Sequence, residues 1–277
     1  MAASHTTSVF ISSRTADIVS LSDEAILKLF HAGADAEAER EAEIARIVQA
    51  TGVRCPRVLG RSERAGRAGI LYSRASGASL ARWLGLRRPW RIRAAGRILA
   101  EAHADLHTYH APDAPSLRER LRREIQAAMV VPARTRALAL HAVAMMPDSD
   151  TLCHGDLTTD NIMLTPDGPL VIDWSEATHG DPAADVARSV VHLAVAHKYY
   201  LSALRRPLAW CAHWGLSTAY SAHYQQLRPE TAARIQYWLL PVAVARLGRG
   251  DEVDAALGDL VDGGQVDAGR VGQGVGL

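Results

Sequence analysis

The feature that most constrains the fold is a pair of short apolar runs joined by a tight turn. Ile162–Leu164 and Leu170–Ile172 flank a segment that contains Pro166 and the pair Asp167-Gly168. Proline and Asp-Gly between apolar runs predict a turn, so the two runs predict a β-hairpin. A hairpin returns its second strand beside its first. Residues before the first run and after the second are therefore expected to lie close together.

Three oxygen-bearing side chains stand around this predicted hairpin. Asp156 lies on the loop before it, Asn161 directly precedes the first run, and Asp173 directly follows the second. We expect the three to converge on one small volume. Asn161 and Asp173 suit Mg²⁺, which takes hard oxygen ligands from the protein and keeps other positions for water and phosphate. Asp156 suits a carboxylate that orients an attacking hydroxyl and accepts its proton, as in phosphoryl transfer.

The residues around these side chains carry a family resemblance. The chain reads His154-Gly155-Asp156, then Asn161, then Ile172-Asp173-Trp174 and Gly180-Asp181-Pro182-Ala183-Ala184-Asp185. Protein kinases share the Asp-to-Asn spacing but read His-Arg-Asp and Asp-Phe-Gly. With this set, the chain resembles the aminoglycoside phosphotransferase and choline kinase superfamily, small-molecule relatives of the protein kinases. The resemblance implies an α+β, two-lobed protein-kinase-like fold with a small antiparallel-sheet N-lobe and a larger helical C-lobe.

The domain boundaries follow from this resemblance and from composition. We predict an N-lobe over residues 1–75, a nucleotide-binding sheet plus a helix, and a helical C-lobe over residues 76–257 with the catalytic loop and acceptor site. A flexible glycine-rich tail is expected over residues 258–277. Short β-branched runs at residues 8–12 and 17–21, followed by Ala25–Phe30, predict an antiparallel meander. No Gly-x-Gly-x-x-Gly motif joins the first two runs, which favours the aminoglycoside relatives over protein kinases.

Lys28 is the candidate phosphate ligand. It is one of only two lysines among 31 basic residues, and it lies inside an apolar strand candidate. A buried ammonium needs an anionic partner, and contact with phosphate oxygens is the kinase use of such a lysine. The resemblance supplies a glutamate partner from the helix predicted over residues 36–50. Glu41 shares the inward face of Ile44 and Val48, and Glu43 is the alternative.

The resemblance assigns further roles. Gly69–Gly77 is similar to the last N-lobe strand and the hinge, which implies that adenine binds backbone groups from Ser73 to Ala75. A base read by main chain leaves both ATP and GTP open. Asp185 is implied to be a buried acid that bonds backbone amides of the catalytic loop, and His154 to orient that loop.

Composition excludes several other classes. A net charge of +1 argues against a dedicated nucleic-acid binder. No run of 18 apolar residues predicts a membrane span, and the first residues lack a secretory pattern. Three cysteines without a Cys-x-x-Cys pair indicate reduced thiols, so we expect a cytoplasmic protein, a monomer or a homodimer.

The sequence therefore predicts a Mg²⁺-dependent kinase that transfers the γ-phosphoryl group of ATP to a hydroxyl of a small molecule, with an antibiotic or amino sugar as the candidate acceptor. Glu176 and Asp181 are candidates for negative charge against a cationic acceptor. One alternative is a nucleotide-binding regulatory pseudokinase without turnover. Another is a metal-dependent hydrolase, whose cluster would be His154, Asp156, His179 and Asp181. His103 and His107 are four residues apart on a predicted helix, and we interpret them as structural.

Overall fold

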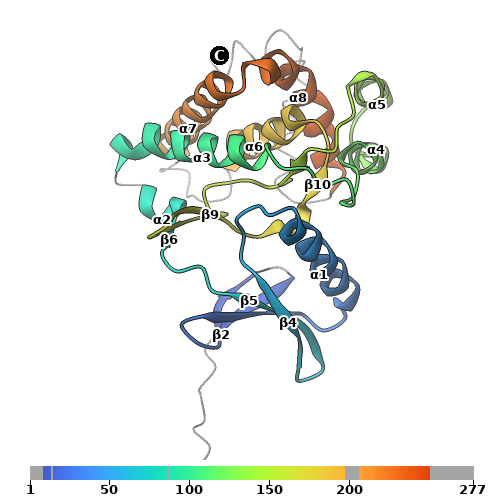
Figure 1. Ribbon diagram of the computed structural model, residues 1–277. Helices are drawn as coiled ribbons and strands as arrows, with labels where there is room; N and C mark the ends of the chain where they lie inside the picture. The colour runs from blue at the N-terminus through green and yellow to red at the C-terminus, as the bar shows by residue number, and fades with distance from the viewer. Residues whose placement is uncertain (1–8, 14, 86–87, 197–205, 250–277) are drawn as a thin grey trace, which may run out of the picture. The chain divides into compact units, whose positions relative to one another are not determined.

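The computed structural model describes residues 9–13, 15–85, 88–196 and 206–249. The chain divides into two compact units. The first comprises Met1–Ala78 and Met163–Ser175, and the second Ser79–Ile162 and Glu176–Leu277. The predicted antiparallel N-terminal sheet and helical C-terminal part are both present (Figure 1). The sequence-based boundary at residue 75 placed residues 163–175 in the second lobe, whereas in the structure they belong to the first unit. The predicted tail, residues 258–277, lies outside the described residues.

The first unit is built on a five-stranded antiparallel sheet in the order β1-β2-β3-β5-β4. Its strands are β1 (Val9–Ser12), β2 (Ala16–Ser20), β3 (Ala25–Phe30), β4 (Val58–Arg64) and β5 (Arg67–Ser73). Side chains alternate between the two faces of a strand. Leu27 and Leu29 of β3 accordingly form a small cluster with Val19 on one face, while Lys28 and Phe30 belong to the other.

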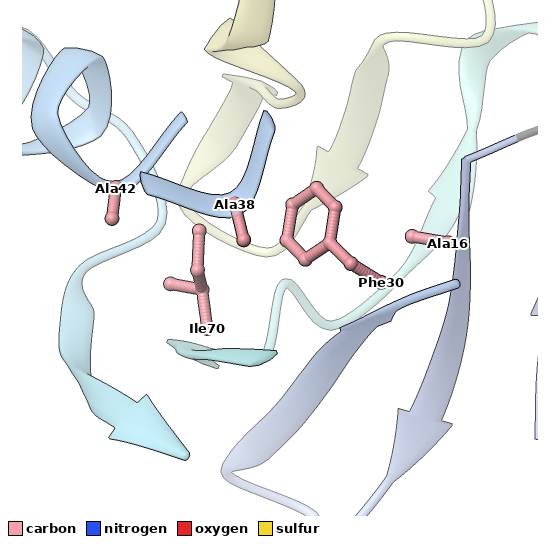
Figure 2. Close-up of a cluster of buried hydrophobic side chains, with 5 residues drawn as sticks. All are labelled: Ala16, Phe30, Ala38, Ala42 and Ile70. Atoms are coloured by element: carbon pink, nitrogen blue, oxygen red, sulfur yellow. The ribbon is translucent and has the colours of Figure 1, made fainter. Parts of the chain in front are cut away.

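Helix α1 (Asp35–Ala50) covers the Phe30 face of the sheet. Figure 2 shows Phe30 and Ile70 of the sheet beside Ala38 and Ala42 of the helix, with Ala16 at the edge of the cluster. All five residues are at most 6% exposed. The small alanine side chains allow the helix to approach the sheet closely, so the cluster fixes α1 over the strand that carries Lys28.

The hairpin predicted after Asn161 is present as β8 (Ile162–Thr165) and β9 (Gly168–Val171). Gly168 has a φ of 103°, a conformation that glycine adopts without steric cost. Arg54 donates to the Asp167 carbonyl oxygen at 2.7 Å and to Thr165 Oγ1 at 3.0 Å. These bonds to a residue more than a hundred positions earlier explain why the hairpin belongs to the first unit. The first segment of that unit ends at Ala78, within the short strand β6 (Ala78–Ser79).

The second unit consists mainly of helices (Figure 1). Its elements are α2 (Leu80–Leu84), α3 (Ile92–Leu106), α4 (Leu117–Ala127), α5 (Ala133–Met145), β7 (Leu152–Cys153), β10 (Thr178–His179), α6 (Pro182–Ala196), α7 (Arg206–Leu227) and α8 (Ala232–Leu247). Helix α3 packs on α7, α6 packs on α7 and α8, and α4 and α5 pack on α8. Strand β7 pairs antiparallel with β10 and directly precedes residues 154–161, the loop that the sequence predicts to be catalytic.

The aromatic residues of α7 and α8 separate into core and surface. Tyr220, Tyr224 and Trp238 are at most 2% exposed, whereas Trp214 and Tyr237 are 42% and 58% exposed. None of the helices in the described part of the chain combines the length and apolarity needed to span a bilayer.

Candidate active site

In the first unit, Lys28 lies between two carboxylates. Its Nζ is 2.8 Å from Glu41 Oε1 and 3.1 Å from Asp173 Oδ1. The Lys28 side chain is only 13% exposed. The structure thus pairs Lys28 with Glu41, while Glu43 is exposed. Burial alone would lower the pKa of Lys28, but the charges of Asp173 and Glu41 outweigh it and raise that pKa above its ordinary value. The ammonium therefore stays charged.

Tyr72 is a further member of this cluster that sequence reasoning missed. Its hydroxyl donates to Glu41 Oε1 at 3.3 Å. Tyr72 lies on β5 beside β3, where its backbone pairs with Ile26. The bond fixes the glutamate oxygen that also contacts Lys28. No local pattern identifies Tyr72 in the sequence, because the contact depends on the order of the strands.

Asp173 has an unusual backbone conformation. Its φ is 58°, in the left-handed region that non-glycine residues seldom occupy. Such conformations cost free energy and concentrate at functional sites. The Asp173 side chain remains 46% exposed although one oxygen meets Lys28. It therefore presents carboxylate surface to a ligand while contacting the ammonium.

The hinge candidates lie at and just after the end of β5, with Ser73 as its last residue and Ala75 two residues beyond. The Ser73 amide donates to the Arg57 carbonyl, and the Arg57 amide donates to Ser73 Oγ, each at 2.8 Å. The Arg74 amide donates to the Glu24 carbonyl at 2.7 Å. Ala75 is the first hinge residue whose amide has no protein acceptor within the described part of the chain. Of Ser73 and Ala75, Ala75 is therefore the better candidate to donate a backbone hydrogen bond to a nucleotide base, because the Ser73 amide already bonds Arg57.

In the second unit, the predicted catalytic loop contains a glycine that no other residue can replace without strain. Gly155 has a φ of 81°, and a Cβ built there would lie 2.3 Å from the Glu176 carbonyl oxygen. The ring Nδ1 of His154 accepts the Asp156 amide at 3.2 Å. His154 therefore holds the Asp156 amide through its ring, which agrees with its predicted role in orienting the loop.

The Asp156 carboxylate is 43% exposed, and its Oδ1 lies 3.3 Å from His192 Nδ1. Burial would raise the pKa of Asp156, but the hydrogen bond and charge of His192 outweigh it and lower that pKa. The side-chain nitrogen Nδ2 of Asn161 donates to the backbone carbonyl oxygen of Asp156 at 2.8 Å. This bond leaves the side-chain oxygen of Asn161 as an acceptor.

Asp185 fixes the backbone of the catalytic loop. It is fully buried, and its two carboxylate oxygens accept the His154 amide at 2.6 Å and the Gly155 amide at 2.8 Å. The expectation of a buried acid bonded to loop amides is confirmed. Despite burial, which would raise it, the pKa of Asp185 lies well below its ordinary value, because His103 and His107 stabilise the carboxylate.

His103 of α3 and His107, the residue directly after that helix, complete the support of Asp185. His103 Nε2 and His107 Nε2 lie 3.1 and 3.4 Å from Asp185 Oδ2. Their Nδ1 atoms lie 2.6 Å from Tyr220 Oη and 2.7 Å from Tyr224 Oη. If each tyrosine donates and each Nε2 carries the proton, every ring nitrogen has a partner. Among the described residues, His103, His107 and Asp185 are the group whose spacing could hold a metal ion. Their hydrogen bonds to one another and to the tyrosines explain the arrangement without a metal, in agreement with the structural role predicted for the two histidines.

Two residues of α6 also act on the loop and were not identified from the sequence. Arg188 Nε donates to the Gly155 carbonyl at 2.7 Å, and His192 meets Asp156. Both lie on the helix face of Asp185, at three and seven residues after it. Helical spacing from Asp185 could therefore have identified Arg188 and His192 from the sequence.

The oxygen donors suit Mg²⁺, whereas the alternative hydrolase cluster does not form. Asn161 offers an amide oxygen and Asp173 a carboxylate, the hard ligands that Mg²⁺ prefers. His179 Nδ1 instead binds the Ser149 carbonyl at 2.8 Å, and Asp181 binds Arg234 at 3.1 Å. The structure brings Lys28, Glu41 and Asp173 together in the first unit, and Asp156 and Asn161 in the second.

Comparison with solved structures confirms the predicted protein-kinase-like fold. A choline/ethanolamine kinase family protein from Mesorhizobium loti is 16% identical, with 97% of this chain and 94% of that chain covered and a TM-score of 0.65. A thermostable mutant of aminoglycoside phosphotransferase APH(4)-Ia, solved with ADP and hygromycin B, is 16% identical, with 95% and 94% covered and a TM-score of 0.64. An aminoglycoside 2′-phosphotransferase-IIIa mutant solved with GDP is 15% identical, with 97% and 93% covered and a TM-score of 0.58.

Sequence comparison gives the family. No curated protein matches the sequence. The model of the phosphotransferase enzyme family matches residues 9–208. Because this match covers most of the chain, the protein belongs to the phosphotransferase enzyme family, and the predicted enzyme class is confirmed.

Proposed function

We propose that the protein is a Mg²⁺-dependent kinase that transfers the γ-phosphoryl group of ATP to a hydroxyl group of a small molecule. The observation that carries the proposal is the Lys28 cluster: a charged, nearly buried ammonium between Glu41 and the half-exposed, conformationally strained Asp173. Such an ammonium is suited to phosphate oxygens, since it is a compact charge already held in place.

The first unit supplies the groups for the nucleotide. Lys28 binds phosphate, Glu41 positions Lys28, and the backbone at Ala75 reads the base. Because main chain rather than side chains contacts the base, the site sets no preference between ATP and GTP. The solved relatives carry ADP in one case and GDP in another, which supports a purine nucleotide of either kind.

Asn161 and Asp173 hold the metal ion in this proposal. Mg²⁺, when bound, supplies positive charge to the phosphate oxygens. Asp173 contributes carboxylate surface that Lys28 does not cover, and Asn161 contributes the side-chain oxygen left open by its bond to Asp156.

Asp156 acts on the acceptor. Its ionised carboxylate accepts a hydrogen bond from the acceptor hydroxyl and orients that oxygen toward the γ-phosphorus. The bond between the γ-phosphorus and the ADP oxygen breaks as the bond to the acceptor oxygen forms, and the hydroxyl proton passes to Asp156 and then to water. The rate enhancement comes mainly from positioning and charge stabilisation. We also propose a cytoplasmic location, where ATP is present, and a monomeric or homodimeric state.

The test is ADP formation by the purified full chain with ATP and Mg²⁺ against aminoglycosides, amino sugars, choline, hydroxy acids and sugar phosphates. Reactions without acceptor and with EDTA are the controls. Acceptor-dependent, EDTA-sensitive ADP formation is expected. Stabilisation of the protein by nucleotide in a thermal shift assay, without turnover of any acceptor, would favour the regulatory pseudokinase instead.

A further inference from the structure

Helix α6 contacts the catalytic loop at Arg188, between its contacts through Asp185 and His192. Arg188 Nε donates to the backbone carbonyl oxygen of Gly155 at 2.7 Å. That carbonyl belongs to the peptide group that joins Gly155 to Asp156, so the bond acts on the backbone link that carries the proposed base. The Arg188 side chain is only 10% exposed, and the bond is therefore largely shielded from water.

This peptide group needs a hold from outside the loop because a glycine precedes it. Gly155 has a φ of 81°, and its close approach to the Glu176 carbonyl oxygen leaves no room for a Cβ. Glycine restricts the backbone torsions less than any other residue does. Without an external bond, the Gly155 carbonyl is free to rotate, and the Asp156 side chain moves with it.

Other residues hold the polar groups on either side of this carbonyl. Asp185 accepts the Gly155 amide at 2.8 Å. His154 Nδ1 accepts the Asp156 amide at 3.2 Å. Arg188 binds the carbonyl between these two amides, so all three polar groups that lead into Asp156 have partners.

Two glutamates orient the guanidinium group of Arg188. Its Nη1 lies 3.5 Å from Glu124 Oε2, and its Nη2 lies 3.8 Å from Glu176 Oε2. Both acids thus meet the far end of the guanidinium and leave Nε directed at the carbonyl. Glu176, a sequence-based candidate for contact with a cationic acceptor, is engaged by Arg120 and Arg249 as well.

We propose that Arg188 is a positioning residue for phosphoryl transfer, which fixes the peptide group before Asp156 and thereby holds the Asp156 carboxylate in the orientation that the acceptor hydroxyl requires. The inference rests on the proposed function, because it takes Asp156 as the residue that orients the hydroxyl. Arg188 touches neither substrate nor metal ion in this scheme. Its effect is geometric, and a displacement of about 1 Å can lower a reaction rate on the order of 10²-fold.

The test compares ADP formation by the full-length wild type and Arg188→Met with ATP, Mg²⁺ and the best acceptor. Methionine keeps an unbranched side chain but has neither the donor nor the charge. We expect kcat to fall roughly 10- to 100-fold, with the KM for ATP within about twofold of wild type, because the groups proposed to bind the nucleotide lie in the first unit. Arg188→Lys keeps a charged donor and should recover part of the lost kcat.

A double-mutant cycle determines whether Arg188 acts through Asp156. In the Asp156→Asn background, Arg188→Met should lower kcat by less than about threefold, because the carboxylate that Arg188 positions has already been removed. A general effect on folding would give the same fold-loss in both backgrounds. The matched control is Arg136→Met, which removes a bond from Arg136 Nη1 to the Val131 carbonyl at 2.9 Å; it should lower Tm and leave kcat unchanged.

Hydrogen exchange measured by NMR provides a readout that needs no turnover. In Arg188→Met, exchange of the Gly155 and Asp156 amides should accelerate at least about tenfold more than exchange of the Leu152 amide, which bonds the Tyr109 carbonyl. No such difference in exchange, an unchanged kcat, or an equal loss of kcat in the Asp156→Asn background would each overturn the inference. If the wild type turns over no acceptor, the proposed function fails, and hydrogen exchange alone decides whether Arg188 holds the loop.

Discussion

Replacement of Asp185 tests the support of the catalytic loop. In Asp185→Ala the amides of His154 and Gly155 lose their acceptor while remaining buried, and the two Nε2–H groups of His103 and His107 lose theirs as well. A buried donor without a partner costs about 1–3 kcal/mol. The two amides alone predict a loss of roughly 2–6 kcal/mol, a large part of the 5–15 kcal/mol that stabilises an ordinary domain.

The assay is thermal and urea unfolding of the variants beside the wild type. For a protein of this size, 1 kcal/mol corresponds to about 2–4 °C in Tm, so Asp185→Ala should melt roughly 5–20 °C lower. Asp185→Asn keeps one oxygen acceptor and should lose less. Asp105→Ala, an exposed acid on α3 between the two histidines, is the matched control and should stay within about 0.5 kcal/mol. A Tm for Asp185→Ala within about 2 °C of wild type would refute the reasoning.

Three other predictions follow from single contacts. Lys28→Ala should weaken productive nucleotide binding, raising the KM for ATP and lowering kcat by at least about tenfold. Unchanged steady-state kinetics would show that Lys28 does not bind the nucleotide phosphates. Burial lowers the pKa of His107 to about 4. As the pH falls below about 6.5, His107 therefore becomes protonated in the unfolded chain but stays neutral in the native protein. Stability measured by urea unfolding should therefore fall between pH 6.5 and 4, by on the order of 3 kcal/mol, and a flat profile would contradict this. Gly155→Ala should destabilise much more than Gly66→Ala, because both positions have positive φ but only Gly155 lacks room for a Cβ; equal losses in Tm would show that the close approach to Glu176 does not matter.

Local signals in the sequence were sufficient for the parts of the site that depend on one element. The Pro and Asp-Gly turn predicted the hairpin, and the lone lysine in an apolar run predicted a buried ammonium. Helical periodicity put Glu41 on the inward face of its helix, where Lys28 meets it. These features follow from turn chemistry and from the strand and helix periods, which act over a few residues.

The remaining contacts depend on which distant elements meet. Nothing local to Arg54 indicates its bonds to the hairpin turn, which attach residues 163–175 to the first unit. Glu176 and Asp181 looked open to a ligand because their arginine partners come from α4, α8 and the residues just after α8. His192 was missed because it contacts Asp156 across the packing of α6 on the loop.

The central claim is that Asp156 orients and deprotonates an acceptor hydroxyl, and one measurement addresses it directly. ADP formation with Mg²⁺, ATP and the best acceptor is compared for wild type, Asp156→Asn and Asp160→Asn, together with nucleotide affinity. Asp156→Asn should lower kcat roughly 10²- to 10⁴-fold with nucleotide affinity unchanged, while Asp160→Asn, at an exposed position in the same loop, should stay close to wild type. Phosphoryl transfer by Asp156→Asn at nearly the wild-type rate would contradict it.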